Sequence, residues 1–319
     1  MAVPAIKAKR HRGSPKKVSA QLGLAIPPGL LADRTKSLAA TVATLPPGVI
    51  QELFEGFSDD ELLALEADWR FWARPDQIAP EGAWTKWLIL AGRGWGKTRT
   101  GAEFIIDEIR SGRAMRVALV GRTAADVRDV MIEGESGILA CSPEDFKPIY
   151  EPSKRRLTWP NGAIATAYSG DEPNLLRGPQ HDLAWADEAA AWRYTEAWDN
   201  LIFGLRLGKH PRVIITTTPK PVPLIKDLVT DPKVFITKGK TQDNAANLAD
   251  SFIAEIERKY AGTRLGRQEM DGELLDDVKG ALWIRNRLDE LRVANNLPDF
   301  VRIVVAIDPA ATSEDGSDE

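Results

Sequence analysis

The sequence predicts an α/β fold in which helices flank a mostly parallel β-sheet. Short apolar runs that suit buried parallel strands recur along the chain, and helical stretches separate several of them. The expected strands span residues 87–90, 116–120, 183–186, 212–216 and 234–236, and the expected helices span 97–110, 123–132 and 193–207. Between residues 141 and 168 the pattern changes to short strands, with Asn161-Gly162 marking a hairpin turn. The chain is therefore expected to combine a parallel core with one hairpin region.

The first expected strand leads directly into a glycine-rich loop and then into a helix. Glycines let backbone amides turn toward an anion, and the helix points its positive N-terminal end at the same place. Lys97 can reach the β- and γ-phosphates of a nucleotide, and the Thr98 hydroxyl can bind Mg²⁺. The first position of the P-loop pattern, usually glycine, is Ala91 here. The sequence thus predicts a nucleotide-binding P-loop formed by Ala91, Gly92, Arg93, Gly94, Trp95, Gly96, Lys97 and Thr98.

A second motif places two carboxylates at the end of a buried strand. Asp187 and Glu188 follow the apolar run 183–186, so both acids are expected at the carboxyl edge of the sheet, beside the P-loop. There Asp187 would hold Mg²⁺, and Glu188 would orient and deprotonate the attacking water. An isolated acidic pair is more often the start of a helix, so this interpretation depends on the P-loop.

Two further motifs carry less information. Thr217 and Thr218 end a strand and could sense the γ-phosphate, although threonine is common in strands. Gln77 lies shortly before the first strand of the sheet. Its amide could bind the adenine edge and select ATP over GTP, or the segment could simply form a turn.

Composition narrows the function classes. The 319-residue chain is 43% hydrophobic and carries a net charge of −4, so any contact with DNA must come from local basic patches. The single Cys141 excludes an internal disulfide or a cysteine zinc cluster, and no apolar run approaches the roughly 20 residues that span a bilayer. The sequence lacks an apolar signal core at its N-terminus. These features predict a soluble intracellular protein.

The N-terminal part has a different character. Residues 1–20 are basic and are expected to form either a solvated tail or a docking arm for nucleic acid or a partner. A helix is expected to begin after Ser58, with Leu65, Trp69 and Trp72 on its apolar face.

Taken together, these motifs resemble the large terminase subunit of tailed bacteriophages and prophages, the motor that packages DNA into capsids. The resemblance covers about residues 68–310. It rests on Gln77, Pro80, Trp84 and residues 92–98, 176–180, 185–189, 217–220 and 266–274. It implies a P-loop ATPase of the ASCE (RecA-like) type, which has an additional strand and a catalytic glutamate.

The resemblance also implies a division of the chain into four regions. These are a basic, partly disordered extension (1–57), the ATPase core (58–242), a helical linker or lid (243–298) and the start of an RNase H-like nuclease domain (299–319). Asp308 resembles the first carboxylate of the nuclease site, which uses Mg²⁺ or Mn²⁺. The remaining acids of that site are not in this chain, so we expect ATP hydrolysis without DNA cleavage.

In the family, an arginine at the position of Arg177 acts in trans on the ATP of the neighbouring subunit. Arg93 is the competing candidate in cis, and Arg177 could instead anchor its own loop. Thr217 and Thr218 correspond to the motif that couples hydrolysis to domain movement. The implied partners are double-stranded DNA, the portal protein, the small terminase subunit and further copies of the chain. These copies would form a pentameric ring when assembled and stay monomeric in isolation, without contact with a membrane. The implied location is the host bacterial cytoplasm, transiently at the portal vertex of the procapsid.

Two other functions share some of these features. A DExx-type helicase also has a P-loop, an Asp-Glu pair and a threonine-rich strand end, but it normally needs a second motor domain. A nucleotide-gated docking protein would use ATP to hold a conformation and hydrolyse it only incidentally.

Overall fold

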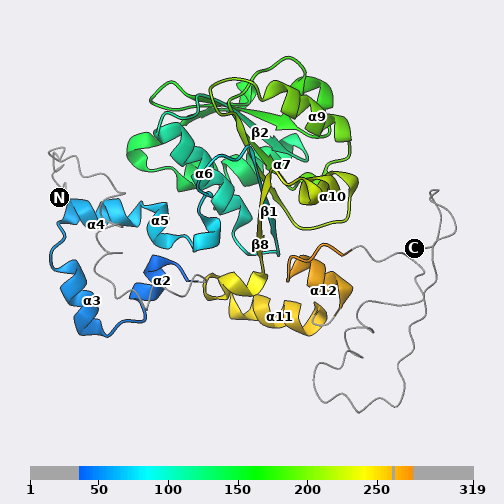
Figure 1. Ribbon diagram of the computed structural model, residues 1–319. Coiled ribbons are helices and arrows are strands. Elements are labelled where there is room, and N and C mark those ends of the chain that lie inside the picture. The colour runs from blue at the N-terminus through cyan, green and yellow to red at the C-terminus, as the bar shows by residue number, and fades with distance from the viewer. Residues whose placement is uncertain (1–35, 261–262, 276–319) are drawn as a thin grey trace, which may run out of the picture. The chain divides into compact units, whose positions relative to one another are not determined.

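The computed structural model describes residues 36–260 and 263–275 (Figure 1). The chain divides into two compact units, Met1–Asp276 and Asp277–Glu319, and every described residue belongs to the first. An eight-stranded sheet has the order β3-β4-β5-β2-β6-β7-β1-β8. In chain order, the strands are β1 (Lys86–Ala91), β2 (Arg116–Gly121), β3 (Ile149–Glu151), β4 (Arg156–Thr158), β5 (Ile164–Ser169), β6 (Leu183–Asp187), β7 (Arg212–Thr217) and β8 (Val234–Gly239).

Six neighbouring strands of the sheet, from β5 to β8, run parallel, whereas β3, β4 and β5 pair antiparallel. The expected α/β class and the hairpin at Asn161-Gly162, between β4 and β5, are both confirmed. Strand β7 lies between the P-loop strand β1 and the acidic strand β6. This additional strand is the arrangement expected for an ASCE-type P-loop ATPase.

Helices cover both faces of the sheet because the strand side chains alternate between two apolar cores. Trp87 and Ile89 of β1 pack in the core that contains α6, whereas Leu88 and Leu90 pack in the core that contains α9 and α10. The helical segments of this region are α6 (Lys97–Arg110), α7 (Ala124–Asp126), the π-helical η2 (Val127–Ile132), α8 (Ile138–Cys141), η3 (Glu144–Phe146), η4 (Pro152–Lys154), η5 (Pro173–Leu176), η6 (Ala189–Ala191), α9 (Thr195–Gly204) and α10 (Pro223–Thr230).

Short helices precede the sheet. They are α2 (Leu38–Val42), α3 (Pro47–Phe54), α4 (Asp59–Glu66), α5 (Trp69–Trp72) and the 3₁₀ segment η1 (Pro75–Gln77). Ser58 caps α4 in a capping box with Glu61, as the sequence suggests. The single amphipathic helix expected through Trp72 is wrong, because Asp68 caps a new helix, α5, and the Trp72 side chain is largely exposed.

Three helical segments follow β8 outside the sheet. They are η7 (Thr241–Asn247), α11 (Asp250–Tyr260) and α12 (Arg264–Glu269). Their existence agrees with the expected helical region after the core. Asp308 and the strand expected before it lie outside the described residues. Among the described helices, none has both the length and the apolar character that crossing a membrane requires.

Candidate nucleotide-binding and hydrolysis site

The glycine loop joins β1 to α6 in a conformation that suits phosphate binding. Gly94 and Gly96 have φ angles of +74° and +102°, a left-handed region that side chains disfavour. The first N–H groups of a helix have no intrahelical acceptor, so those of α6 are available at the end of the loop. The loop can therefore present several N–H groups to an anion.

Lys97 joins this loop to the tips of the two neighbouring strands. Its buried Nζ donates to the carbonyl oxygens of Ala91 (3.0 Å) and Gly92 (3.3 Å) and to Thr218 Oγ1 (3.2 Å). Nζ also lies 3.8 Å from Glu188 Oε1. Burial lowers the pKa of Lys97, while the nearby carboxylates oppose this shift.

Asp187, the last residue of β6, is buried and is held by a relay of two hydrogen bonds. Thr216 Oγ1 donates to Asp187 Oδ1 (2.6 Å), and Trp185 Nε1 donates to Thr216 Oγ1 (2.7 Å). Burial raises the pKa of Asp187 to about 7, Glu188 adds to the shift, and the Thr216 hydrogen bond opposes it. The sequence reasoning missed Thr216, although it directly precedes the predicted Thr217.

Glu188 has a left-handed backbone, with φ 46° and ψ 44°, which is uncommon for a residue with a side chain. Its N–H donates to Thr216 O (2.6 Å), and its Oε2 accepts from the N–H of Thr218 (3.3 Å) and, weakly, from Thr217 Oγ1 (3.5 Å). The strained backbone turns this carboxylate toward the tip of β7 while leaving its side chain 41% exposed.

A cavity of about 330 Å³ brings most of the predicted residues together. It is lined by Arg93, Thr98, Asp187, Glu188 and Thr218, and this volume is within the usual range for a small-molecule site. Lys97 and Thr217 contact its walls through the bonds described above.

The same cavity is lined by three residues that the sequence reasoning missed, Arg122, Asp126 and Lys220. Arg122 directly follows β2 and forms an ion pair with Asp126 (3.3 Å between Nε and Oδ2). Lys220 follows the tip of β7. Their position just after parallel strands was the available signal, since those ends meet at one edge of the sheet.

Arg93 points from the loop toward α12. Its Nε lies 2.6 Å from Glu269 Oε2, and its backbone N–H donates to Glu269 O (2.7 Å). The hydrogen bond to Glu269 raises the pKa of Arg93. The P-loop is thus tied to the helical region that follows the core.

Arg177 lies elsewhere on the same chain. It follows η5, is exposed, and is not among the residues that line the 330 Å³ cavity. The structure therefore does not bring Arg177 to the carboxylates of its own subunit.

Gln77 braces the end of the P-loop. Its Nε2 donates to Thr100 Oγ1 (3.2 Å), and its Oε1 accepts from the N–H of Arg74 (3.1 Å). A Cβ added at Gly96 would come within 2.8 Å of this Nε2. The glycine is therefore required by close approach as well as by its φ angle.

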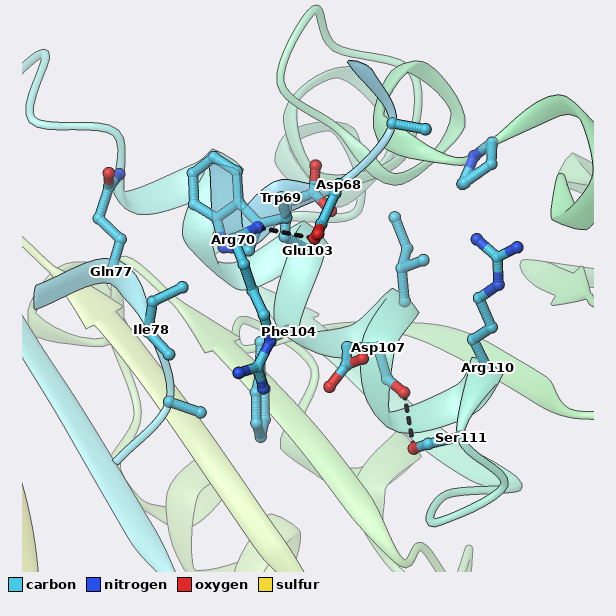
Figure 2. Close-up of a pocket in the computed structure, with 14 residues that line it drawn as sticks. Asp68, Trp69, Arg70, Gln77, Ile78, Glu103, Phe104, Asp107, Arg110 and Ser111 are labelled. Atoms are coloured by element: carbon cyan, nitrogen blue, oxygen red, sulfur yellow. Dashed lines mark hydrogen bonds between the residues drawn. The ribbon is translucent and has the colours of Figure 1, made fainter. Parts of the chain in front are cut away.

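Gln77 also lines a second cavity, of about 360 Å³, formed by α5, η1 and α6 (Figure 2). Figure 2 shows Trp69 and Phe104 beside the carboxylates of Asp68 and Glu103. Although it is slightly larger, it contains none of the P-loop residues or the strand-end acids. The chemistry suited to a nucleotide therefore lies in the other cavity.

Glu103 in this second cavity gives a pH-dependent prediction. Burial raises its pKa from 4.5 to about 7, although the Arg99 ion pair opposes this shift. The unfolded state therefore releases its proton first, and the folded state loses stability as the pH rises from about 4.5 to about 7. Glu103→Gln should raise the free energy of unfolding above pH 7 by at most about 3 kcal/mol.

Urea unfolding at several pH values measures this difference. The gain from Glu103→Gln should shrink toward zero as the pH falls below the ordinary carboxyl pKa. A gain that does not change with pH would contradict the shifted titration.

The oxygen donors at the P-loop cavity fit Mg²⁺. Magnesium is usually bound by one or two protein oxygens, with phosphate oxygens and water completing its shell. Thr98 and Asp187 line the same cavity and supply a hydroxyl and a carboxylate. Within residues 36–260 and 263–275, no group of three or more His, Cys, Asp or Glu side chains could form a metal cage.

Comparison with known proteins identifies the family. The model of the "Terminase large subunit, T4likevirus-type, N-terminal" family matches residues 88–289. The ATPase domain of the large terminase of Thermus phage P74-26 has a similar fold. Its TM-score is 0.51 at 16% identity over 68% of this chain and 98% of that one.

The large terminase of another thermophilic bacteriophage, in complex with ADP, also has a TM-score of 0.51, at 14% identity over 60% of this chain. The match spans 49% of that protein, about half its length. No curated protein sequence matches this chain. Because the family model covers more than half of the residues, the chain belongs to the T4-like type of terminase large subunits and matches their N-terminal region.

Proposed function

We propose that this chain is an ATP-hydrolysing motor subunit that moves double-stranded viral DNA through the portal into a procapsid. The observation that carries the proposal is the meeting of the P-loop lysine with two strand-end carboxylates at one edge of the sheet. Family membership supplies the packaging context.

The proposed site divides its work among a few groups. The N–H groups of the P-loop and the Lys97 ammonium bind the β- and γ-phosphates of ATP. Thr98 and Asp187 hold Mg²⁺, which neutralises charge on the phosphate oxygens when it is bound. Glu188 orients a water for in-line attack on the γ-phosphorus and accepts its proton.

The strand tip between the loop and the acids supports a coupling role. Thr218 contacts Lys97 through its hydroxyl and Glu188 through its N–H, and Thr217 Oγ1 lies 3.5 Å from the same carboxylate. A change at the γ-phosphate would therefore reach β7 directly. We propose that Thr217 and Thr218 pass this change to the rest of the motor.

The catalytic arginine has two candidates with different positions. Arg93 is in the cavity but is paired with Glu269, whereas Arg177 is exposed and outside it. These positions favour Arg177 as a group that acts on the ATP of a neighbouring subunit, with Arg93 as the alternative in cis.

Mixed rings test this assignment. Arg177→Ala subunits should still bind ATP but hydrolyse it about 10³-fold more slowly in a ring, because a guanidinium no longer stabilises the transition state. Adding Glu188→Gln subunits, which supply the arginine, should partly restore turnover. Absence of rescue in rings of verified mixed composition would favour Arg93.

The remaining assignments are part of the same proposal. We assign residues 58–242 to the ATPase core, 243–298 to a linker or lid, 1–57 to an N-terminal extension and 299–319 to the start of a nuclease domain. The proposed partners are DNA, the portal protein, the small terminase subunit and other copies in a pentameric ring. The proposed location is the host cytoplasm and, transiently, the portal vertex.

The function is tested by measuring ATP hydrolysis with and without double-stranded DNA and portal protein. A packaging motor should be stimulated only within the assembly. Strand separation would instead indicate a helicase. Slow turnover in the complete assembly would indicate a docking protein that ATP holds in one conformation.

A further inference from the structure

We propose that Thr241, Asn244 and Arg74 are positioning residues of the P-loop, which hold its peptide groups so that their N–H groups face the phosphates. This inference rests on the nucleotide site proposed above and adds groups on the opposite side of the loop. None of the three lines the 330 Å³ cavity.

Each of these side chains donates to one of three consecutive carbonyl groups in the loop. The bonds run from Thr241 Oγ1 to Arg93 O (2.7 Å), from Asn244 Nδ2 to Gly94 O (2.7 Å) and from Arg74 Nη2 to Trp95 O (2.6 Å). The donors come from two segments far apart in the sequence, since Arg74 precedes η1 and the other two belong to η7.

The geometry of the peptide group gives these bonds their consequence. In a trans peptide, the carbonyl of one residue and the N–H of the next point in opposite directions. Holding Arg93 O and Trp95 O on the side of these donors therefore turns the N–H groups of Gly94 and Gly96 the other way. The left-handed φ of both glycines is the conformation that such an anion-binding nest uses. The N–H of Trp95 additionally closes a turn onto Gly92 O at 3.4 Å.

The donors are themselves fixed. Asn244 Oδ1 accepts from Arg74 Nη1 and from Asn247 Nδ2, both at 2.9 Å, which leaves the Asn244 amide nitrogen facing the loop. The buried Arg74 guanidinium also lies 5.0 Å from the centre of the Trp95 ring. A loop held in this way has its donors oriented before the phosphates arrive, which is the condition for strong electrostatic binding.

Thr241→Val tests the hydroxyl with little change of shape. Thr241 keeps its backbone bond to Met270 O (2.7 Å) in this variant, so the loss is confined to the donor for Arg93 O. Titration of a fluorescent ADP analogue with Mg²⁺ should show about tenfold weaker binding. Thr241→Ser, which restores the donor, should bind ADP as the wild type does.

A spectroscopic measurement separates positioning from a general structural role. In protein labelled with ¹⁵N-glycine, the Gly94 amide signal should shift when ADP binds, and Thr241→Val should reduce that shift more than the shift of Gly96. Unchanged ADP affinity and an unchanged Gly94 response in a folded Thr241→Val variant would overturn the inference.

Asn244→Asp provides a second test in case the valine variant does not fold. The carboxylate can still accept from Arg74 and Asn247, but it cannot donate to Gly94 O. We expect ADP affinity to fall by about tenfold or more. The matched control is Gln242→Glu, the same change of amide to carboxylate at an exposed position of η7, which should bind ADP normally.

The test distinguishes this inference from the proposed function. Wild-type protein should bind ADP, and Lys97→Ala should not. If both hold and neither the Thr241 nor the Asn244 variant binds ADP more weakly, only the positioning role is wrong. If the wild type does not bind ADP, the nucleotide site and the positioning role are both wrong.

Discussion

Glu188→Gln should keep ATP bound while its hydrolysis slows by about 10²- to 10⁴-fold, the usual contribution of a general base. The amide has nearly the shape of the carboxylate but cannot take a proton from water. Its oxygen can still accept from the N–H of Thr218 (3.3 Å), so the tip of β7 should keep its place. Binding of an ATP analogue and single-turnover hydrolysis in the DNA- and portal-stimulated assembly measure the two effects separately.

Glu81→Gln is the matched control, because Glu81 is exposed in the segment before β1 and outside the cavity. This variant should hydrolyse ATP at the wild-type rate. A near-normal rate for Glu188→Gln in the same assembly would remove Glu188 as the base. Slow turnover by the isolated chain would not be informative, because a trans arginine is missing from a monomer.

Lys97→Ala should lose measurable binding of both ATP and ADP. The substitution removes the buried ammonium that contacts the loop carbonyls and Thr218, and it leaves the carboxylates of Asp187 and Glu188 without their nearby cation. The negative charges of the phosphates and of these acids would then face one another with less compensation.

Calorimetric titration with ADP and Mg²⁺ measures this loss. The unfolding midpoint without nucleotide shows whether the variant is folded, and nucleotide should raise the midpoint of the wild type only. A folded Lys97→Ala protein that binds ADP with wild-type affinity would refute the P-loop assignment.

The parallel core could be predicted from the sequence because buried strands appear as continuous apolar runs. The expected strand at 183–186 lies within β6 and the expected helix at 97–110 coincides with α6. The order of the strands could not be predicted in this way. The position of β7 between β1 and β6 depends on packing between distant segments, and no local pattern encodes it.

The site divides in the same way. Lys97 and Asp187 follow recognisable motifs, so the sequence could identify them. Arg122 and Lys220 have no motif of their own and enter the cavity only because the ends of parallel strands meet at one edge. The contacts of Gln77 with Arg74 and Thr100 were likewise hidden, since Thr100 is 23 residues away in the chain.

The central claim is that ATP lies with its phosphates on the P-loop and its terminal bond facing the two strand-end acids. A crystal structure with a non-hydrolysable ATP analogue and Mg²⁺ tests it most directly. We expect the metal between Thr98 and Asp187, and the γ-phosphate within reach of Lys97 and a water held by Glu188. Phosphates bound away from the loop, or a metal distant from both acids, would contradict the account.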